Sequence, residues 1–214
     1  MSPEEIARFL RAHPQFFDEH PELLESIYVP HPHGGRAIAL TERQILGLRD
    51  KTKALEAKLA ELIRIGTENE VIGEKVHRLA LALIAARDFT SSVQAVYFHL
   101  REDFAVPHVA LRIWGKAPPA EAPEGIAVDP ALRATVESLG APQCGPAAGN
   151  PFLAWFGDAG EHVRSVALVP LGQTRSFGLL AFGAEDPQRF YPEMGTLYLR
   201  RIGELVGGAL ASRL

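Results

Sequence analysis

The apolar residues between positions 41 and 86 recur at alternating spacings of three and four, which is the a/d pattern of a heptad repeat. Thr41 followed by Gln44 forms a capping-box pattern and predicts where this helix begins. A helix over residues 41–86 would be about 70 Å long, too long for a compact domain of this size, so part of it must project or pair with another chain. We predict a homodimer whose interface lies on the apolar positions of this frame, which are Ile45, Leu48, Leu55, Leu59 and Leu62, with Thr52 between them.

The heptad frame weakens after Leu62. Gly66 and Asn69 occupy the next frame positions, and each glycine inside a helix costs about 1 kcal/mol relative to alanine. We therefore expect the helix to bend or break between Gly66 and Gly73. The apolar register resumes one position earlier, at Ile65, Ile72, Val76, Leu79 and Leu83.

The first 40 residues read as short helices separated by prolines. Pro14 and Pro21 stand where a helix can begin, because the missing proline N–H has no partner there in any case. Residues 28–35 contain two prolines and two glycines, so this segment is extended and forms a linker.

From residue 88 onward the pattern changes to mixed helix and strand. Ser91 with Gln94 predicts a second capping box and an amphipathic helix after it. The terminal helix carries Gly203, Gly207 and Ala211 four residues apart, a ridge of small residues that packs either within the domain or in a dimer. Strands are predicted at 108–114, 163–171 and 177–184, helical segments at 130–139, 149–156 and 192–214, an exposed loop at 115–127 and a hairpin loop at 172–176.

These elements together predict an α+β fold. An antiparallel sheet flanked by helices is preceded by a long, coiled-coil-like helix and short N-terminal helices. We divide the chain into an arm of short helices and linker over residues 1–40, a dimerisation helix over 41–87 and a globular domain over 88–214.

Composition narrows the class of protein. The chain has 214 residues, of which 47% are apolar, and a formal net charge of -4. That charge gives no electrostatic reason to expect nucleic acid. No apolar run reaches the roughly 18 residues of a membrane span, and the acidic start differs from a basic signal peptide, so we expect a cytoplasmic protein that binds no membrane.

Candidate chemistry is sparse. His13, His20, His31 and His33 could suggest a metal site, but three of them precede proline and are explained as helix-entry and linker residues, so we expect no metal. The single cysteine, Cys144, could attach a ligand or act in redox chemistry, or simply be a small buried apolar residue. The catalytic motifs of hydrolases, metalloproteases and nucleotide-binding enzymes are missing from the sequence, so we predict no enzymatic activity and no cofactor.

The order of elements resembles that of GAF domains, with residues 165–171 and 177–183 and the terminal helix similar to the last third of that fold. The whole chain resembles a bacterial family known only as domain of unknown function 484. Its matching segments are His13-Pro14-Gln15-Phe16-Phe17, His20-Pro21-Glu22-Leu23-Leu24, Pro30-His31, Glu42-Arg43-Gln44, Cys144-Gly145 and Arg189-Phe190-Tyr191-Pro192-Glu193-Met194-Gly195-Thr196. The resemblance implies a GAF-like domain behind a helical N-terminal segment and no established activity.

A GAF-like arrangement closes the segments after the first strand over the sheet. Aromatic residues with one or two cations there would suit a small anionic or planar ligand, whereas the alternative is that the aromatic rings fill the core and Arg175 is a solvated hairpin residue. The candidate ligand-binding residues are Arg112, Trp114, Cys144, Phe152, Trp155, Phe156 and Arg175.

Two functions remain open from the sequence. The first is a non-enzymatic regulatory or sensory module that acts as a homodimer and binds a small ligand in the domain pocket. The second is an adaptor with a filled pocket that binds a partner protein through apolar residues of the N-terminal arm, namely Phe9, Phe16, Phe17, Leu23 and Leu24.

Overall fold

The computed structural model describes residues 2–29, 38–115, 118–119, 121–172 and 175–214. Contacts divide the chain into two compact units, Met1–Gly66 and Thr67–Leu214. The division falls inside the long helix rather than at its end, because the last turns of that helix pack into the second unit. Among the described residues, no helix is long and apolar enough to cross a membrane.

Short helices make up the start of the first unit. Helix α1 (Pro3–Ala12) begins with a capping box in which the Ser2 hydroxyl accepts from the Glu5 N–H and the Glu5 carboxylate accepts from the Ser2 N–H. The helices expected after Pro14 and Pro21 are confirmed as α2 (Phe16–Glu19) and α3 (Glu22–Ser26).

Two short strands follow, β1 (Tyr28–Val29) and β2 (Ile38–Ala39), which pair antiparallel. The predicted linker agrees with the structure at its extended start. Its remaining residues, with His31 and His33, lie outside the described part of the chain.

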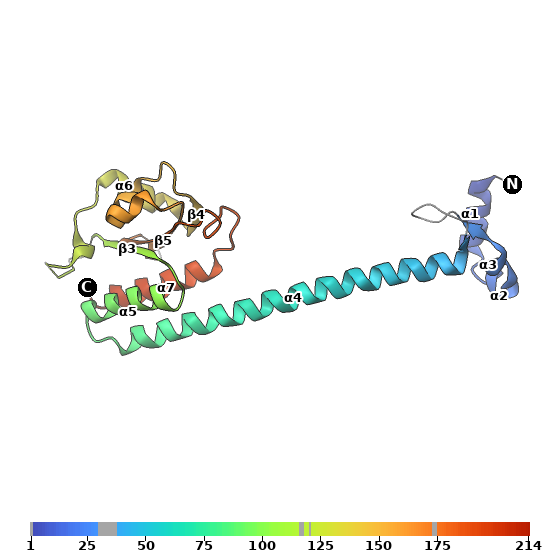
Figure 1. The fold of residues 1–214 in the computed structure, drawn as a ribbon, viewed down its shortest axis with the longest axis horizontal. Coiled ribbons are helices and arrows are strands. Elements are labelled where there is room, and N and C mark those ends of the chain that lie inside the picture. Colours follow the sequence, from blue (N-terminus) through green and yellow to red (C-terminus); the bar gives the residue numbers. More distant parts are fainter. Residues whose placement is uncertain (1, 30–37, 116–117, 120, 173–174) are drawn as a thin grey trace. The chain divides into compact units, whose positions relative to one another are not determined.

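Helix α4 (Leu40–Ala85) is one helix of 46 residues. It begins just before Thr41 and passes through Gly66 and Gly73 without interruption, so the break expected there is wrong (Figure 1). The cost of two glycines is small for a helix of this length that is otherwise rich in strong helix formers. A residue of the last helix also contacts this part of α4: the Tyr198 hydroxyl donates to the Asn69 carbonyl at 2.8 Å.

The next helix, α5 (Phe89–Glu102), begins earlier than the sequence pattern indicated. Its N-cap is Asp88, whose carboxylate accepts from the Ser91 N–H at 2.7 Å, and the Ser91 hydroxyl accepts in return from the Asp88 N–H. The predicted box of Ser91 and Gln94 is therefore wrong. The capping box lies one turn earlier and satisfies the backbone N–H groups of Asp88 and Ser91.

A four-stranded antiparallel sheet, in the order β3-β6-β5-β4, forms the centre of the second unit in the part that the structure describes. The three predicted strands are confirmed as β3 (His108–Ile113), β5 (Ser165–Leu171) and β6 (Gly178–Ala184). The edge strand β4 (Gln143–Pro146), which pairs with β5, was not expected. This arrangement confirms the α+β fold with an antiparallel sheet flanked by helices.

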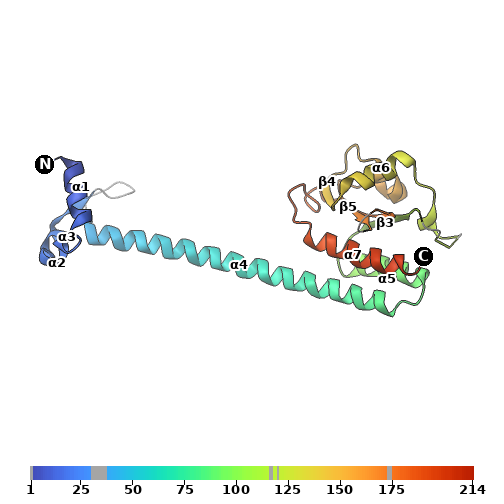
Figure 2. The same ribbon diagram turned by 180° about the vertical axis from the view of Figure 1, so that it is seen from behind.

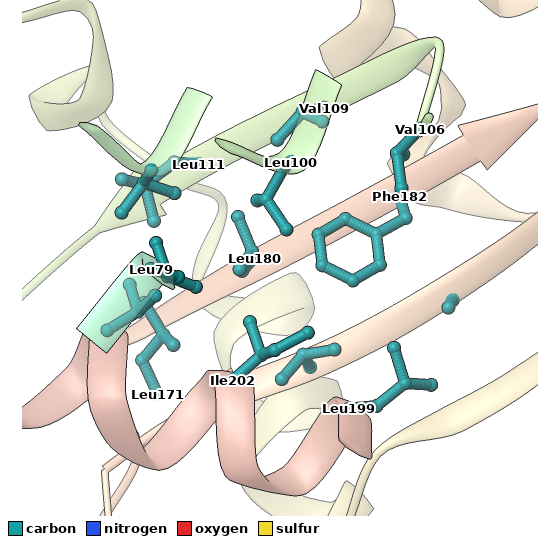
Figure 3. Packing of buried hydrophobic residues seen from close by; sticks show 14 of the residues in the cluster. Leu79, Leu100, Val106, Val109, Leu111, Leu171, Leu180, Phe182, Leu199 and Ile202 are labelled. Atoms are coloured by element: carbon teal, nitrogen blue, oxygen red, sulfur yellow. The ribbon is translucent and has the colours of Figure 1, made fainter. Parts of the chain in front are cut away.

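One face of the sheet carries the larger core, here called the main core. Helices α5 and α7 (Leu197–Ala211) lie on this face beside the end of α4 (Figure 1 and Figure 2). Figure 3 shows side chains from the sheet and these helices pointing toward one another. The residues labelled there include Leu79, Leu100, Leu111, Leu171, Leu180, Phe182 and Ile202.

Helix α7 begins at Leu197, not at Pro192 as predicted, because the preceding segment forms turns around the buried Phe190. Its ridge of small residues packs inside the domain. A Cβ on Gly203 would lie 2.6 Å from the Val169 side chain of β5, so only glycine permits this close approach.

The opposite face of the sheet is covered by shorter elements. Helix α6 (Pro130–Leu139) begins at the predicted place, with Asp129 as its N-cap, and ends at Gly140 in the left-handed conformation. The 3-10 segment η2 (Pro151–Glu161) includes the helical turn expected at 149–156. A shorter 3-10 turn, η1 (Pro123–Gly125), lies within the predicted loop 115–127.

Candidate functional site

The candidate ligand site lies on the face of the sheet covered by α6 and η2, here called the second face. Strand β3 directs alternate side chains to the two faces, so Trp114 joins the second face while Leu111 and Ile113 join the main core. Trp114 is buried, and its indole N–H donates to the Ser176 carbonyl at 3.1 Å. The buried apolar residues of this face are Ala110, Trp114, Val128, Val136, Phe152, Leu168, Leu179 and Ala181.

Arg112 and three of the predicted aromatic residues lie at this face, with one ring in contact with the cation. The Arg112 guanidinium lies 5.7 Å from the centre of the Trp155 ring, a cation–π distance, and donates to the Leu111 carbonyl at 2.8 Å. Phe152 meets Trp155 edge to face with ring centres 5.0 Å apart. Phe156 packs against the same apolar cluster. The chain therefore brings Arg112, Phe152, Trp155 and Phe156 together, with Phe152 fully buried as a core residue.

The outer edge of β3 carries a polar cluster that sequence reasoning missed. The Tyr97 hydroxyl, from α5, lies close to the carboxylate of Glu124 and to the backbone of Leu111. Glu124 comes from η1 and is buried, with 5% of its surface exposed. Burial and the Glu124 carboxylate raise the pKa of Tyr97 to about 12, so its hydroxyl stays protonated at neutral pH. The Arg112 guanidinium in turn satisfies the Leu111 carbonyl of this edge strand.

Cys144 does not join the other predicted residues. It lies on β4 opposite Ala167, is half-buried and packs against the main core, which is the other face of the sheet. Burial raises the pKa of the Cys144 thiol, which disfavours the reactive thiolate.

Arg175 lies apart from the second face as well. Its side chain is 85% exposed and pairs with Glu137 of α6 at 3.2 Å. Both line a groove of about 1090 Å³ between the end of α6, the end of β5 and the glycine-bearing side of α7. Arg200 and Glu204 also line this groove, so its charges of opposite sign balance.

The predicted dimer residues form an exposed apolar line on α4, here called the α4 stripe. Ile45, Leu48, Leu55, Leu59 and Leu62 are 47% to 66% exposed. The resumed register changes its surroundings along the helix: Ile65 is 41% exposed and Ile72 is partly buried, whereas Val76, Leu79 and Leu83 are buried in the main core. The α4 stripe is therefore exposed, while the end of the resumed register packs on its own domain.

The N-terminal arm presents a cluster of aromatic rings. Phe9 contacts His13 and Phe16, and Phe16 contacts Phe17 and His20, with ring centres 4.7 to 5.9 Å apart. Phe9 and Ile6 remain more than 40% exposed. His13 and His20 thus pack on aromatic rings, and among the described residues there is no group of three or more potential metal-ligating side chains.

Comparison with known proteins assigns the family. The family described as "Protein of unknown function, DUF484" matches residues 1–213. The chain belongs to this family. A protein named "Uncharacterized protein YigA" from Salmonella typhimurium is 28% identical to this DUF484 chain over 207 residues, covering 92% of this chain and 86% of that protein. The protein of the same name from Escherichia coli is 27% identical over 207 residues.

Several solved structures are similar to part of this DUF484 chain. A GAF domain from A. aeolicus nlh2 covers 68% of the chain and 99% of its own length at 15% identity, with a TM-score of 0.46. The GAF domain of an Acinetobacter phosphoenolpyruvate-protein phosphotransferase covers 66% of the chain and 93% of its own length at 12% identity, with a TM-score of 0.48. A free methionine-R-sulfoxide reductase from Neisseria meningitidis, in complex with its substrate, covers 66% and 89% at 16% identity, with a TM-score of 0.46. Likenesses of this size identify neither a ligand nor an activity.

Proposed function

We propose that this DUF484 chain is a non-enzymatic regulatory or sensory module with a GAF-like domain, and that it acts as a homodimer through α4. The order of helices and strands around the antiparallel sheet supports the GAF-like assignment. Cys144 is the single cysteine, and burial raises the pKa of its thiol. A raised pKa disfavours the thiolate that the cysteine chemistry of a reductase requires.

The α4 stripe is the observation that carries the homodimer. Five large aliphatic side chains at heptad spacing are about half or more exposed on one helix. Burying such a side chain contributes about 1.5 to 3 kcal/mol, so leaving the row in water forgoes a large stabilisation. Contiguous exposed apolar surface of this kind marks an interaction site.

Light scattering combined with sedimentation tests the homodimer. The unmodified chain is expected to be a dimer at micromolar concentration, and Leu55→Asp is expected to be a monomer because it places a charge in the interface. Ala57→Asp is the matched control, since this neighbouring exposed position lies outside the stripe and the variant should remain a dimer. A monomeric unmodified chain at micromolar concentration would overturn the homodimer.

A small anionic or planar ligand at Arg112, Trp155 and their neighbours is the sensory part of this proposal. Thermal-shift measurements against nucleotides, haem-like compounds and acidic metabolites test it. A ligand present at 100 times its dissociation constant should stabilise the fold by roughly 2.7 kcal/mol. The matched control is Arg112→Gln, which removes the cation and should abolish the shift. Absence of any shift across these classes would contradict ligand sensing.

The exposed aromatic surface of the arm favours a second function, an adaptor that binds a partner protein through Ile6, Phe9 and the rings packed beside them. Deleting residues 1–40 separates the two functions. An adaptor loses its partner protein when the arm is removed, whereas a sensor keeps its ligand-induced thermal shift. The partner would be measured by pull-down with the complete chain as reference.

A further inference from the structure

We propose that α4 pairs with α4 of a second copy in parallel and in register, and that Lys51 of each protomer forms an ion pair with Glu56 of its partner. The inference rests on the proposed homodimer and adds the orientation and the groups that determine it. It concerns the segment 45–62 within the first compact unit.

The exposed side chains define the heptad frame. Spacings of three and four assign Ile45, Thr52 and Leu59 to the a positions, and Leu48, Leu55 and Leu62 to the d positions. Thr52 is the polar exception, and its hydroxyl donates to the Leu48 carbonyl at 3.0 Å. Its hydrogen-bonding need is therefore met within the helix, and the side chain can be covered by a partner. An open, shallow hollow on this line is lined by Ile45, Leu48, Arg49, Thr52, Lys53 and Glu56. The first four occupy the a, d, e and a positions between which a partner side chain at d packs.

Charges beside the stripe distinguish the two orientations. The g positions are Gln44, Lys51 and Lys58, and the e positions are Arg49, Glu56 and Ile63. In a parallel pair, each g residue faces the e residue five positions further along the partner. Lys51 then faces Glu56 in both directions, Gln44 faces Arg49, and no like charges meet.

An antiparallel pair over the same segment is less favourable. There g residues face g residues and e residues face e residues, so Lys51 meets Lys58 of the partner twice, while Arg49 meets Glu56 twice. Two repulsive contacts thus offset two attractive ones. The parallel arrangement keeps two attractive pairs without an opposing term.

Both charges are available for this pairing. Lys51 and Glu56 are exposed, and neither forms an ion pair within the part of the chain that the structure describes. Elsewhere on α4, opposite charges do form an ion pair within the helix, since Arg64 pairs with Glu61 at 2.6 Å. Lys51 and Glu56 are therefore both free to form an ion pair with a second copy of the chain.

Charge reversal tests the pairing through the dimer dissociation constant, measured by sedimentation at low salt. Lys51→Glu and Glu56→Lys should each weaken the dimer roughly fivefold, and the double exchange should return it to within about twofold of the unmodified chain. Asp50→Lys reverses a charge at an exposed f position, away from the stripe, and should leave the constant within about twofold. In an antiparallel pair Lys51→Glu would instead tighten the dimer, because the introduced carboxylate would then face Lys58 of the partner, and that result would overturn the proposal.

Cysteine cross-linking tests the orientation directly. In a Cys144→Ser background, Leu48→Cys and Leu62→Cys are made separately and oxidised. Disulfides need Cα atoms within about 7 Å of each other, and these two positions are about 21 Å apart along a helix, so only a parallel, in-register pair lets both variants cross-link to themselves. Both variants should therefore form covalent dimers.

The outcomes separate the two levels of the proposal. A dimer in which neither variant cross-links to itself, but a mixture of Leu48→Cys and Leu59→Cys chains does, overturns the parallel orientation and leaves the homodimer standing, because an antiparallel pair over this segment places position 48 opposite position 59. A dimer in which no combination cross-links also overturns the pairing of these segments in register. A monomer by sedimentation overturns both the orientation and the homodimer.

Discussion

Helix α4 places the same residue type in two opposite environments. Leu79, in the second compact unit, has no exposed surface, whereas Leu55, in the first, is 66% exposed. The two leucines share one helix and similar apolar spacing, so helix propensity and hydrophobicity cannot account for the difference. What differs is the surrounding structure, since side chains of the sheet, α5 and α7 pack around Leu79. An apolar stripe thus predicts that a helix face will be covered, but not by what.

The end of α4 is also held by polar contacts from the C-terminal segment. Arg213, just beyond α7, donates to the Leu83 and Ala86 carbonyls at 2.9 and 2.8 Å. These carbonyls lie at the C-terminal end of α4, where helix C=O groups have no partner within the helix. The guanidinium therefore caps α4 and joins it to the C-terminal segment.

The largest expected effect comes from removing the buried leucine. Leu79→Ala should lower the free energy of unfolding by about 2 to 5 kcal/mol, because it leaves a cavity in the main core. Leu55→Ala is the matched change on the same helix and should alter the stability of the monomer by less than about 0.5 kcal/mol. Chemical denaturation at concentrations below dimer formation measures both. Equal losses at the two sites would show that the comparison between the two ends of α4 is mistaken.

A smaller effect should follow from removing the cap on α4. Arg213→Ala is expected to cost about 1 to 2 kcal/mol, because the Leu83 and Ala86 carbonyls lose charged donors. Arg213→Lys keeps the charge but not the two-pronged geometry and should recover part of the loss. Denaturation measures the stability, and amide exchange at the last turn of α4 should quicken in Arg213→Ala. Unchanged exchange there would contradict the capping role.

The smallest effect concerns an ion network between α4 and α5. Asp103 accepts from His99 Nδ1 at 2.6 Å and from the Arg78 guanidinium at 3.1 Å, and the His99 contact followed by the Arg78 contact lowers the pKa of Asp103 below its usual 3.8. A lowered pKa means that folding favours the charged carboxylate. The stabilisation is therefore fully present above about pH 4 and is lost as the pH falls through the lowered value.

Asp103→Asn should accordingly destabilise the protein by less than about 1 kcal/mol at pH 7, with the difference from the unmodified chain shrinking below about pH 3. Urea denaturation of both proteins across this range measures the effect. Asp158→Asn, at an exposed position of η2, serves as the control and should match the unmodified chain at pH 7. A difference that grows toward low pH would refute the network.

Several elements were readable from the sequence because their signals are local. The alternation in residues 108–114 predicted β3, and Asp129 with Pro130 predicted α6, since a cap and a two-residue period act within a few positions. The starts of α5 and α7 were misjudged by a few residues. At α5, two overlapping residue pairs could each form a cap, and at α7 the burial of Phe190 decided where the turns end.

The candidate site was predictable only in part. Arg112, Phe152 and Trp155 do come together, whereas Cys144 packs on the opposite face of the sheet. The position of Cys144 could not be predicted, because the edge strand β4 has no distinctive sequence pattern. Tyr97 lies close to Glu124, although α5 precedes β3 in the sequence and η1 follows it. No spacing rule connects them, so sequence reasoning could not find this cluster.

The sequence by itself determined that residues 41–86 are helical on both sides of Gly66 and Gly73, that β3 alternates, and that two apolar registers exist along α4, because these properties depend on neighbours a few residues away. It did not show that the helix continues through the two glycines. The tertiary structure decided which register is buried. Val76, Leu79 and Leu83 meet the main core, while the α4 stripe remains exposed. Burial depends on surfaces brought together from distant parts of the chain, and that information is absent from local periodicity.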